Sequence, residues 1–252
     1  MLEESFIFLQ GVGKKREQEL WEQGIHTWDD FLIKKNSKSL KIKSYNDRLI
    51  RLARNALSFQ DCNFFKTFLP LRESWRLYET FKHKALYLDI ETSGYYTDVT
   101  VVGIADNFRY KAFVKDINLS RAAIKREIHQ AKLIITFNGS SFDLPVLQRR
   151  LGIYINIPHI DMRSVCSQIG LRGGLKKIER QLQIQRAHKV QSVTGAEAVY
   201  LWQLWRHTKE KEYLEKLIDY NKADVLNLQP LAEYCIAELW KRRKEPKMIG
   251  SK

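Results

Sequence analysis

The segment Leu86–Gly94 (LYLDIETSG) places two acidic residues in and just after a short apolar run. Side chains alternate between the two faces of a β-strand, so Asp89 and Glu91 point the same way if this run is a strand. Adjacent carboxylates repel each other unless a cation lies between them, and oxygen ligands suit hard ions such as Mg²⁺ and Mn²⁺. The segment therefore predicts either a metal site at the carboxyl end of a buried central strand or a strand end with two solvated acids.

The chain from Ala85 onwards has the pattern of an α/β domain with a mixed sheet of about five strands, flanked by helices. The short connections between the first three predicted strands favour antiparallel neighbours. Apolar runs and turn signals predict strands over 85–91, 100–105, 110–114, 132–137 and 154–157. Helices are predicted over 120–130, 141–151, 162–170, 175–182, 195–206 and 210–240, the last of them broken at Pro230.

The composition indicates a folded protein with a polyanionic partner. Hydrophobic residues make up 44% of the chain, and the formal net charge is +14. The hydrophobic content argues against a disordered protein, and the large basic excess favours nucleic acid as the partner. No membrane partner is expected, because the sequence has no long apolar span and no lipidation signal.

The cysteines and the first residues of the chain predict a cytoplasmic protein. Cys62, Cys166 and Cys235 match no zinc-binding spacing, and we expect them to be reduced thiols without a functional role. Residues 1–10 begin with acidic residues and lack the basic region that opens a signal peptide. Neither feature points to secretion.

The N-terminal stretch Phe6–Leu32 predicts a small all-α module. We expect a helix that ends at Gly11, a Gly-Val-Gly turn, a second helix over 14–22 and a short third helix over 27–32. The pattern resembles the helix-hairpin-helix module, which grips the DNA backbone without reading its sequence. Backbone N–H groups at a helix N-terminus favour a phosphate. The residues expected to bind the DNA backbone are Gly11, Val12, Gly13, Lys14 and Lys15. The alternative is a helical hairpin used for packing or for a protein partner.

Four segments are therefore expected along the chain. The helix-hairpin-helix module (1–35) precedes a basic helical linker (36–82), the α/β domain (83–240) and a basic tail (241–252). A run rich in lysine and serine at 34–43 overlaps the start of the linker and leads into an amphipathic basic helix at 45–59.

Two later stretches place acidic side chains where Asp89 and Glu91 could meet them. Residues 135–147 (ITFNGSSFDLPVL) predict a strand, a Gly-Ser loop and a helix whose first turn carries Asp143. This acid could instead simply cap the helix. Residues 219–228 (DYNKADVLNL) place Tyr220 and Asp224 at positions i and i+4 on one helix face. Such a pair would supply a metal ligand and a group that orients a nucleophile.

Taken in order, these motifs resemble the three exonuclease motifs of the DEDD superfamily. The tyrosine four residues before Asp224 indicates the tyrosine variant (DEDDy). The second motif is similar to that of the proofreading domains of family B DNA polymerases. The sequence around all three motifs is similar to the stand-alone YprB-type ribonuclease-H-like exonucleases, over residues 75–239. The resemblance implies a ribonuclease H-like fold.

The same resemblance implies a role for each matched residue. Asp89 would bridge two divalent ions, Mg²⁺ or Mn²⁺, and Glu91 and Asp224 would complete the ion that holds the attacking water. Asp143 would act through metal-bound waters, and Tyr220 would orient the attacking water. The residues implied to place the terminal nucleotide are Asn138, Phe142 and Thr92.

Other charged side chains nearby have two interpretations each. Asp161 could reach the same site, or it could cap the helix that follows it. Arg172, Lys176 and Lys177 surround a Gly-Gly pair and could contact substrate phosphates, or they could form a solvated basic loop.

The predicted function is that of a metal-dependent 3′–5′ exonuclease that hydrolyses phosphodiester bonds of DNA, preferably single-stranded. Three alternatives remain open at this point. The first is a 3′–5′ exoribonuclease that processes RNA with the same chemistry, and the second is a structure-specific endonuclease. The third is a catalytically inactive adaptor that binds nucleic acid, which the presence of all four acids and the tyrosine disfavours.

Overall fold

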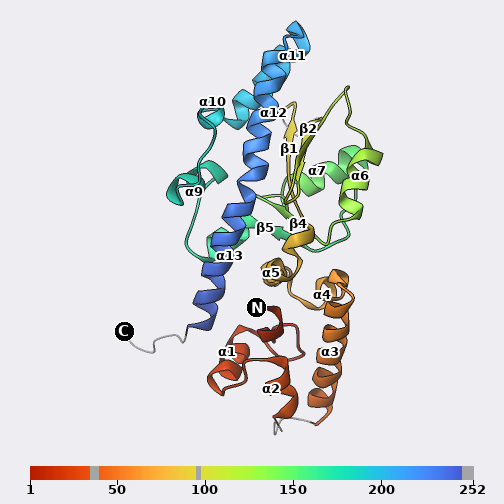
Figure 1. The fold of residues 1–252 in the computed structure, drawn as a ribbon, viewed down its shortest axis with the longest axis vertical. Helices are drawn as coiled ribbons and strands as arrows, with labels where there is room; N and C mark the ends of the chain where they lie inside the picture. The colour runs from red at the N-terminus through yellow and green to blue at the C-terminus, as the bar shows by residue number, and fades with distance from the viewer. Residues whose placement is uncertain (35–39, 95–97, 246–252) are drawn as a thin grey trace. The chain divides into compact units, whose positions relative to one another are not determined.

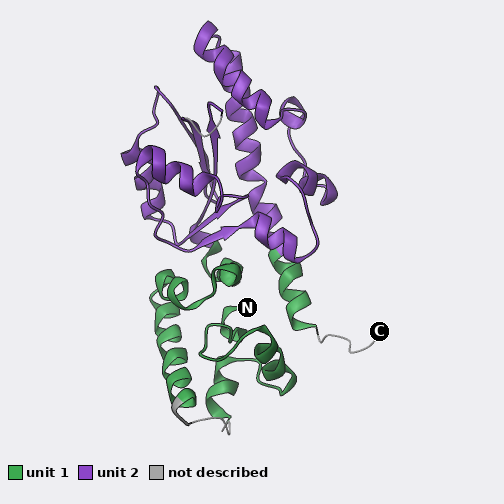
Figure 2. Cartoon of the chain, turned by 180° about the vertical axis from the view of Figure 1, so that it is seen from behind, with its two compact units in different colours: residues 1–82, 236–252 green, residues 83–235 purple. Residues whose placement is uncertain are grey.

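The computed structural model describes residues 1–34, 40–94 and 98–245. The chain divides into a helical unit (residues 1–82 and 236–252) and a sheet unit (residues 83–235), which Figure 2 shows in green and purple. Part of the predicted run at 34–43 and the end of the predicted tail lie outside the described residues, whereas Lys241–Lys244 belong to the last helix. No helix of the described ranges is long and apolar enough to cross a membrane.

The sheet unit contains a mixed five-stranded sheet with the order β3-β2-β1-β4-β5. The first three strands pair antiparallel, as the short connections between them predict, and β4 and β5 continue in parallel from β1. The strands are β1 (Ala85–Thr92), β2 (Val99–Ala105), β3 (Tyr110–Val114), β4 (Leu133–Thr136) and β5 (His159–Asp161). The prediction of an α/β domain with a mixed sheet is confirmed.

Helices cover both faces of this sheet (Figure 1). Leu86, Leu88 and Ile90 of β1 join the apolar core on the side of α6 and α7. Because side chains alternate along a strand, Asp89 and Glu91 face the opposite side, where α11 and α12 pack on Val101 of β2. The helices of the sheet unit are α6 (Arg121–His129), α7 (Asp143–Leu151), α8 (Met162–Gln168), α9 (Leu175–Gln181), α10 (His188–Gln191), α11 (Gly195–Thr208), α12 (Lys211–Leu226) and the start of α13 (Leu228–Lys244).

One predicted strand is wrong, since residues 154–157 form no strand and β5 begins at His159 instead. Helix α7 ends at Gly152, which adopts a left-handed conformation with φ of 60°. The chain then runs as a loop in which Ile155 and Ile157 pack on the core without pairing. Pairing with β4 starts only where the carbonyl of Pro158 accepts from the N–H of Ile134 at 3.0 Å. Alternating apolar side chains alone therefore did not specify a strand here.

The long helix predicted over 210–240 is divided, as expected, near Pro230. The interruption falls at Asn227, between α12 and α13. Proline cannot donate a backbone hydrogen bond, and its ring clashes with the carbonyl four residues earlier, at Leu226. Pro230 therefore occupies the first turn of α13, where a missing N–H is tolerated.

The helical unit differs from its prediction at the N-terminus. Residues 7–11 form turns and a bend, not the helix expected to end at Gly11, and only a short 3₁₀ segment, η1 (Leu2–Glu4), is helical before them. Phe6 to Leu9 are four consecutive buried apolar residues, and an α-helix on a surface would bury only one side of such a run. The remaining elements are α1 (Lys14–Glu22), α2 (Trp28–Ile33), α3 (Leu40–Ser58), α4 (Cys62–Phe68), η2 (Leu71–Leu77), α5 (Tyr78–Phe81) and η3 (Lys82–Lys84).

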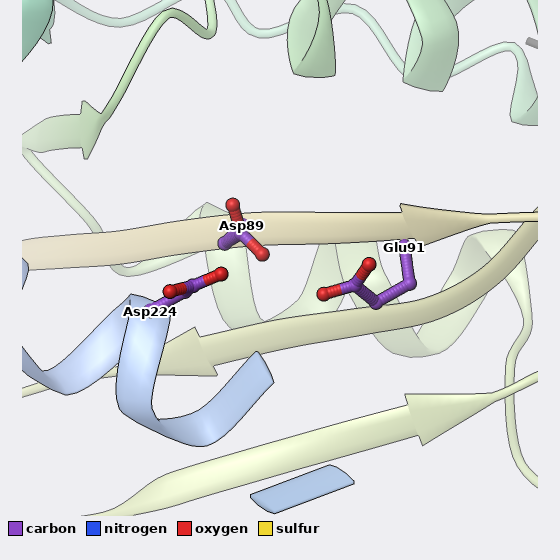
Figure 3. Close-up of side chains that lie close together, drawn as sticks. All are labelled: Asp89, Glu91 and Asp224. Carbon is purple, nitrogen blue, oxygen red and sulfur yellow. The ribbon is translucent and has the colours of Figure 1, made fainter. Parts of the chain in front are cut away.

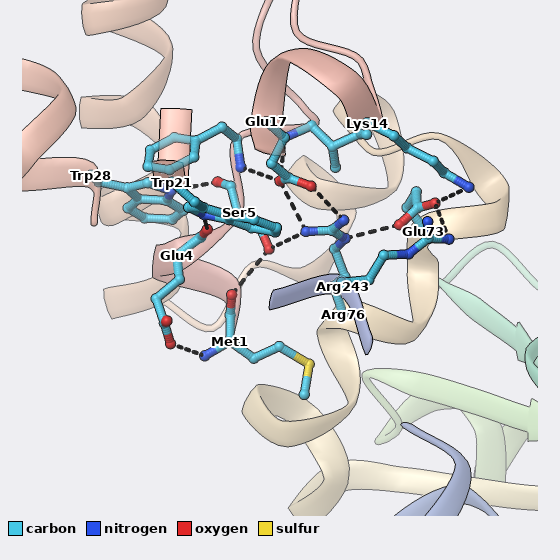
Figure 4. Close-up of polar contacts among 12 residues, drawn as sticks. Met1, Glu4, Ser5, Lys14, Glu17, Trp21, Trp28, Glu73, Arg76 and Arg243 are labelled. Atoms are coloured by element: carbon cyan, nitrogen blue, oxygen red, sulfur yellow. Dashed lines mark hydrogen bonds and ion pairs between the residues drawn. The ribbon is translucent and has the colours of Figure 1, made fainter. Parts of the chain in front are cut away.

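A buried ion network explains why the N-terminal segment forms turns (Figure 4). The carboxylate of Glu17, on α1, accepts hydrogen bonds from the backbone N–H groups of Phe6 at 2.7 Å and Ile7 at 3.1 Å. The fully buried guanidinium of Arg76 donates to Glu17 at 2.7 Å and to Glu73 at 2.9 Å. These backbone donors are therefore satisfied by a side chain instead of by a helical carbonyl.

Candidate active site

Three carboxylates from two distant parts of the chain converge on one face of the sheet (Figure 3). Asp89 and Glu91 come from β1, and Asp224 comes from α12. One ligand atom from each lies within 4.8 Å of the others, which is close enough to share a metal ion. Helix α12 carries Asp224 to this place because Leu217 and Tyr220 on the same helix pack on Val101 of β2.

Asp143 joins these acids from the opposite face of the sheet. It is the first residue of α7 and is buried, and its Oδ1 accepts a hydrogen bond of 3.1 Å from the backbone N–H of Ile90, between Asp89 and Glu91. The carboxylate is close enough for its charge to act on both Asp89 and Glu91. Asp143 is therefore more than a helix cap, although it stands outside the group of three that could share one ion.

The burial of these like charges raises the pKa values of their carboxyl groups. Burial, followed by the charges of Asp224 and Glu91, raises the pKa of Asp89 well above its usual value. Burial and the charge of Asp224 also raise the pKa of Glu91. Burial raises the pKa of Asp143 to about 7. Without a cation the four acids thus favour protonation, and a divalent ion would relieve their repulsion.

Arg186 is the main neighbour of this cluster that sequence reasoning missed. Its guanidinium is ion-paired with Asp224 and donates to Glu179 at 2.8 Å, and Glu179 also accepts from the side chain of Asn227 at 3.0 Å. Burial raises the pKa of Asp224, and the charge of Arg186 opposes this rise. No local motif marks Arg186, because its partner lies 38 residues further along the chain.

Tyr220 lies beside Asp224 as the i, i+4 spacing predicts. Its hydroxyl lies close to the Asp224 carboxylate, and burial together with the charge of that acid raises the tyrosine pKa. The phenol therefore stays protonated and able to donate. Lys176 lies over the ring of this residue, with its Nζ 4.7 Å from the centroid of the Tyr220 ring.

Asn221 is a second residue whose contact with the acids sequence reasoning missed. Its side chain is fully buried and donates to the Asp89 carboxylate at 2.8 Å, while its Oδ1 accepts from the hydroxyl of Tyr110 at 2.9 Å. The helix can approach the sheet this closely because residue 103 of β2 is glycine. A Cβ at Gly103 would lie 1.8 Å from the Asn221 Oδ1. Only the position of Asn221 next to Tyr220 could have signalled its role.

The residues expected to place the terminal nucleotide have separate structural roles. Asn138 adopts a left-handed φ of 66°, and its N–H donates to Asp161 at 2.8 Å. Asp161 also caps α8 by accepting from the N–H of Arg163, so its capping interpretation is confirmed. Phe142 packs on the apolar core next to α7, and Thr92 is buried at the end of β1. These positions border the acidic cluster in the chain, and their contacts with a substrate stay predictions.

The residues expected to bind the DNA backbone belong to the helical unit. Gly11 has a left-handed φ of 76°, Val12 follows it in the loop, and Gly13 is the N-cap residue of α1. Lys15 is exposed, whereas the Nζ of Lys14 is ion-paired with the buried Glu73 at 3.0 Å. The binding role of these residues stays a prediction. Residues 5–11 are not helical, so the first helix of the expected hairpin is missing.

The comparison with protein families agrees with this fold. The family model RNase_H_2, described as the RNase_H superfamily, matches residues 86–236, well over half of the chain. The chain belongs to the RNase H superfamily. Among solved structures, this RNase H-like chain is similar to Escherichia coli RNase D, described as an exoribonuclease involved in structured RNA processing. The two are 18% identical with a TM-score of 0.43 over 70% of this chain and 48% of that chain, so this chain spans about half the length of RNase D. No curated protein matches the sequence.

The donor set of this RNase H-like site fits a hard divalent cation. The cluster Asp89, Glu91 and Asp224 offers only carboxylate oxygens, which Mg²⁺ and Mn²⁺ prefer. Asp143 adds a further carboxylate beside it, and Tyr220 supplies a protonated hydroxyl next to Asp224. The arrangement can therefore bind a cation, hold a phosphate next to it and orient a water molecule.

Proposed function

We propose that this chain is a metal-dependent 3′–5′ exonuclease of the DEDDy type that hydrolyses phosphodiester bonds of DNA, with single strands preferred. The observation that carries the proposal is the convergence of Asp89, Glu91 and Asp224, whose ligand atoms lie within 4.8 Å of one another, with Tyr220 next to Asp224. Membership of the RNase H superfamily supports it, since the matched residues include all of these side chains.

In this proposal Asp89, Glu91, Asp143 and Asp224 hold two divalent ions, Mg²⁺ or Mn²⁺. When bound, such ions stabilise the charge that develops on the attacking and leaving oxygens. Tyr220 orients the attacking water through its hydroxyl, which stays protonated because its pKa is raised. Asn221 fixes the carboxylate of Asp89, and Arg186 holds that of Asp224. Asn138, Phe142 and Thr92 place the terminal nucleotide.

DNA is the proposed substrate on the strength of one resemblance, that of the second motif to proofreading domains. The loop Gly11–Lys15 is proposed to add a nonspecific contact with the nucleic-acid backbone. Its contribution rests mainly on the exposed Lys15, because Lys14 is already paired with Glu73. The net charge of +14 supports a polyanionic substrate of either kind.

The test uses end-labelled single strands of DNA and RNA of the same sequence, with Mg²⁺, Mn²⁺ or EDTA. The proposal predicts a ladder that starts at the 3′ end, requires a metal and forms faster with DNA. A faster reaction on RNA would identify an exoribonuclease instead. Cleavage of a circular strand would identify an endonuclease, and binding without cleavage under every metal would leave the adaptor as the better account.

A further inference from the structure

Two buried cationic groups of the sheet unit have donor atoms that no other described residue satisfies. The Nζ of Lys176 and the Nη1 of Arg186 are buried without a hydrogen-bond partner in the described part of the chain. The Arg186 side chain is only 4% exposed. Leaving a buried charged donor unsatisfied costs free energy, so these two atoms suit a ligand that accepts hydrogen bonds.

Both groups line the same pocket next to the acidic cluster. The pocket has a volume of about 480 Å³, within the range that holds a small ligand or a nucleotide. Its position is fixed by two contacts, since Lys176 packs on the ring of Tyr220 and Arg186 pairs with Asp224. The basic side chains in its lining are Lys176, Arg180 and Arg186, and its only acid, Glu179, is already bound by Arg186.

We propose that Lys176 and the free Nη1 of Arg186 form an anion subsite that binds a backbone phosphate of the nucleic-acid strand. This proposal rests on the proposed function, because it names the contact that holds the strand beside the carboxylates. A phosphate oxygen would satisfy both unpaired donors and neutralise two neighbouring positive charges. The positive charges of Lys176 and Arg186 would also offset the repulsion between the strand and the carboxylates of Asp89, Glu91 and Asp224.

The chain offers a matched control for this subsite. Lys177 follows Lys176 on α9 but is exposed and does not line the pocket. Lys176→Met and Lys177→Met therefore remove the same charge from adjacent positions. Methionine also retains the apolar stem that packs on Tyr220, so the fold around the pocket should persist.

The experiment measures binding of a fluorescent short DNA strand, and of its RNA counterpart, by anisotropy over a range of salt concentrations. All variants carry Asp89→Ala, so that the strand stays intact with Mg²⁺ present. Lys176→Met should raise Kd about tenfold, as expected for a charge-assisted hydrogen bond. It should also lower the slope of log Kd against log salt by about 0.7, the value for one lost phosphate contact on a single strand. Lys176→Arg should keep the parent's Kd and salt slope, and Lys177→Met should change neither of these two quantities.

Two other results would overturn the subsite in distinguishable ways. If the Asp89→Ala parent binds the strand but Lys176→Met and Lys177→Met behave alike, the subsite is wrong and the proposed function stands. If the parent binds neither DNA nor RNA, the nucleic-acid substrate itself is wrong, and the subsite fails with it. Thermal melting of each variant checks that a loss of binding is not a loss of folding.

Discussion

The side chain of Asn221 on α12 donates a hydrogen bond of 2.8 Å to the carboxylate of Asp89 on β1, across 132 positions of sequence. This bond fixes the rotamer of the acid at the centre of the cluster. It depends on Gly103, where any Cβ would lie 1.8 Å from the Asn221 side chain. One glycine of β2 therefore sets how closely helix and strand can bring their acids together.

The first prediction concerns this contact. Gly103→Ala should displace Asn221 and reduce metal-dependent activity about 10- to 100-fold, the usual effect of losing a residue that orients a metal ligand. Asn221→Ala should have a similar effect, measured as kcat/KM on a labelled strand. Gly195→Ala is the control, since a Cβ there meets nothing within 4 Å. Full activity of Gly103→Ala would show that the Asn221 contact is dispensable.

The second prediction concerns stability without metal. Asp89→Asn removes one of several buried, mutually repelling carboxylates, so it should raise the free energy of unfolding in EDTA. The gain should appear as a higher denaturant concentration at the midpoint of unfolding than that of the unmodified protein. Mn²⁺ should raise the Tm of the unmodified protein and leave that of the variant nearly unchanged. A destabilised variant would mean that Asp89 stabilises the fold instead of straining it.

The third prediction is a pH dependence. The carboxyl of Asp143 has a pKa of about 7 when folded, against 3.8 in its unperturbed form. Between pH 3.8 and about pH 7 the folded state binds more protons than the unfolded state, so the contribution of Asp143 to stability falls as pH rises. His159 opposes this trend. Burial lowers its pKa to about 4, so its charged form destabilises the folded state at low pH, and this destabilisation disappears as pH rises. The Tm of Asp143→Asn minus that of the unmodified protein, both in EDTA, should therefore increase from about pH 5 to about pH 8. A difference that stays constant would contradict the raised pKa.

The fourth prediction concerns Tyr220. Tyr220→Phe keeps the ring that packs on Lys176 but removes the hydroxyl next to Asp224. We expect kcat to fall about a hundredfold with little change in KM, because a misoriented nucleophile affects the reaction more than binding. Tyr213→Phe is the matched control, since Tyr213 lies on the same helix and packs on the same apolar cluster. An equal loss in both variants would point to packing instead of orientation.

The fifth prediction concerns the helical unit. Arg76→Met leaves the buried carboxylates of Glu17 and Glu73 without their shared cation. Breaking a buried ion pair in this way costs about 3–5 kcal/mol, so thermal unfolding should shift strongly downwards. Arg72→Met removes the same charge from an exposed position on the same 3₁₀ segment and should change Tm little. Similar Tm values for both variants would refute the structural role of the network.

Short-range patterns predicted the parts of the site that lie on single elements. The spacing of Asp89 and Glu91 on a strand, and of Tyr220 and Asp224 on a helix, placed each pair on one face without knowledge of the rest. The ribonuclease H-like fold followed from the order of strands and helices together with the resemblance of the three motifs. For the two residue pairs, the decisive information lay within a few residues.

The remaining features depend on contacts between distant segments, which spacing does not encode. Arg186 meets Asp224 only after α10 and α12 have packed, and Asn221 meets Asp89 only because Gly103 leaves room. The N-terminal helix was predicted wrongly for a similar reason. Phe6 and Ile7 bind the distant carboxylate of Glu17 with the N–H groups that a helix would have used.

The most direct test compares two single variants. One removes the carboxylate of Asp89, which belongs to the metal-binding group, and the other removes that of Asp219, which does not. Asp219, on the same helix as Asp224, is ion-paired with Lys189 and lies outside the metal-binding group. A 5′-labelled DNA strand with Mn²⁺ should be shortened from its 3′ end by the unmodified protein and by Asp219→Asn. It should stay intact with Asp89→Ala and in EDTA. Shortening by Asp89→Ala at the rate of the unmodified protein would contradict the carboxylate site as the centre of catalysis.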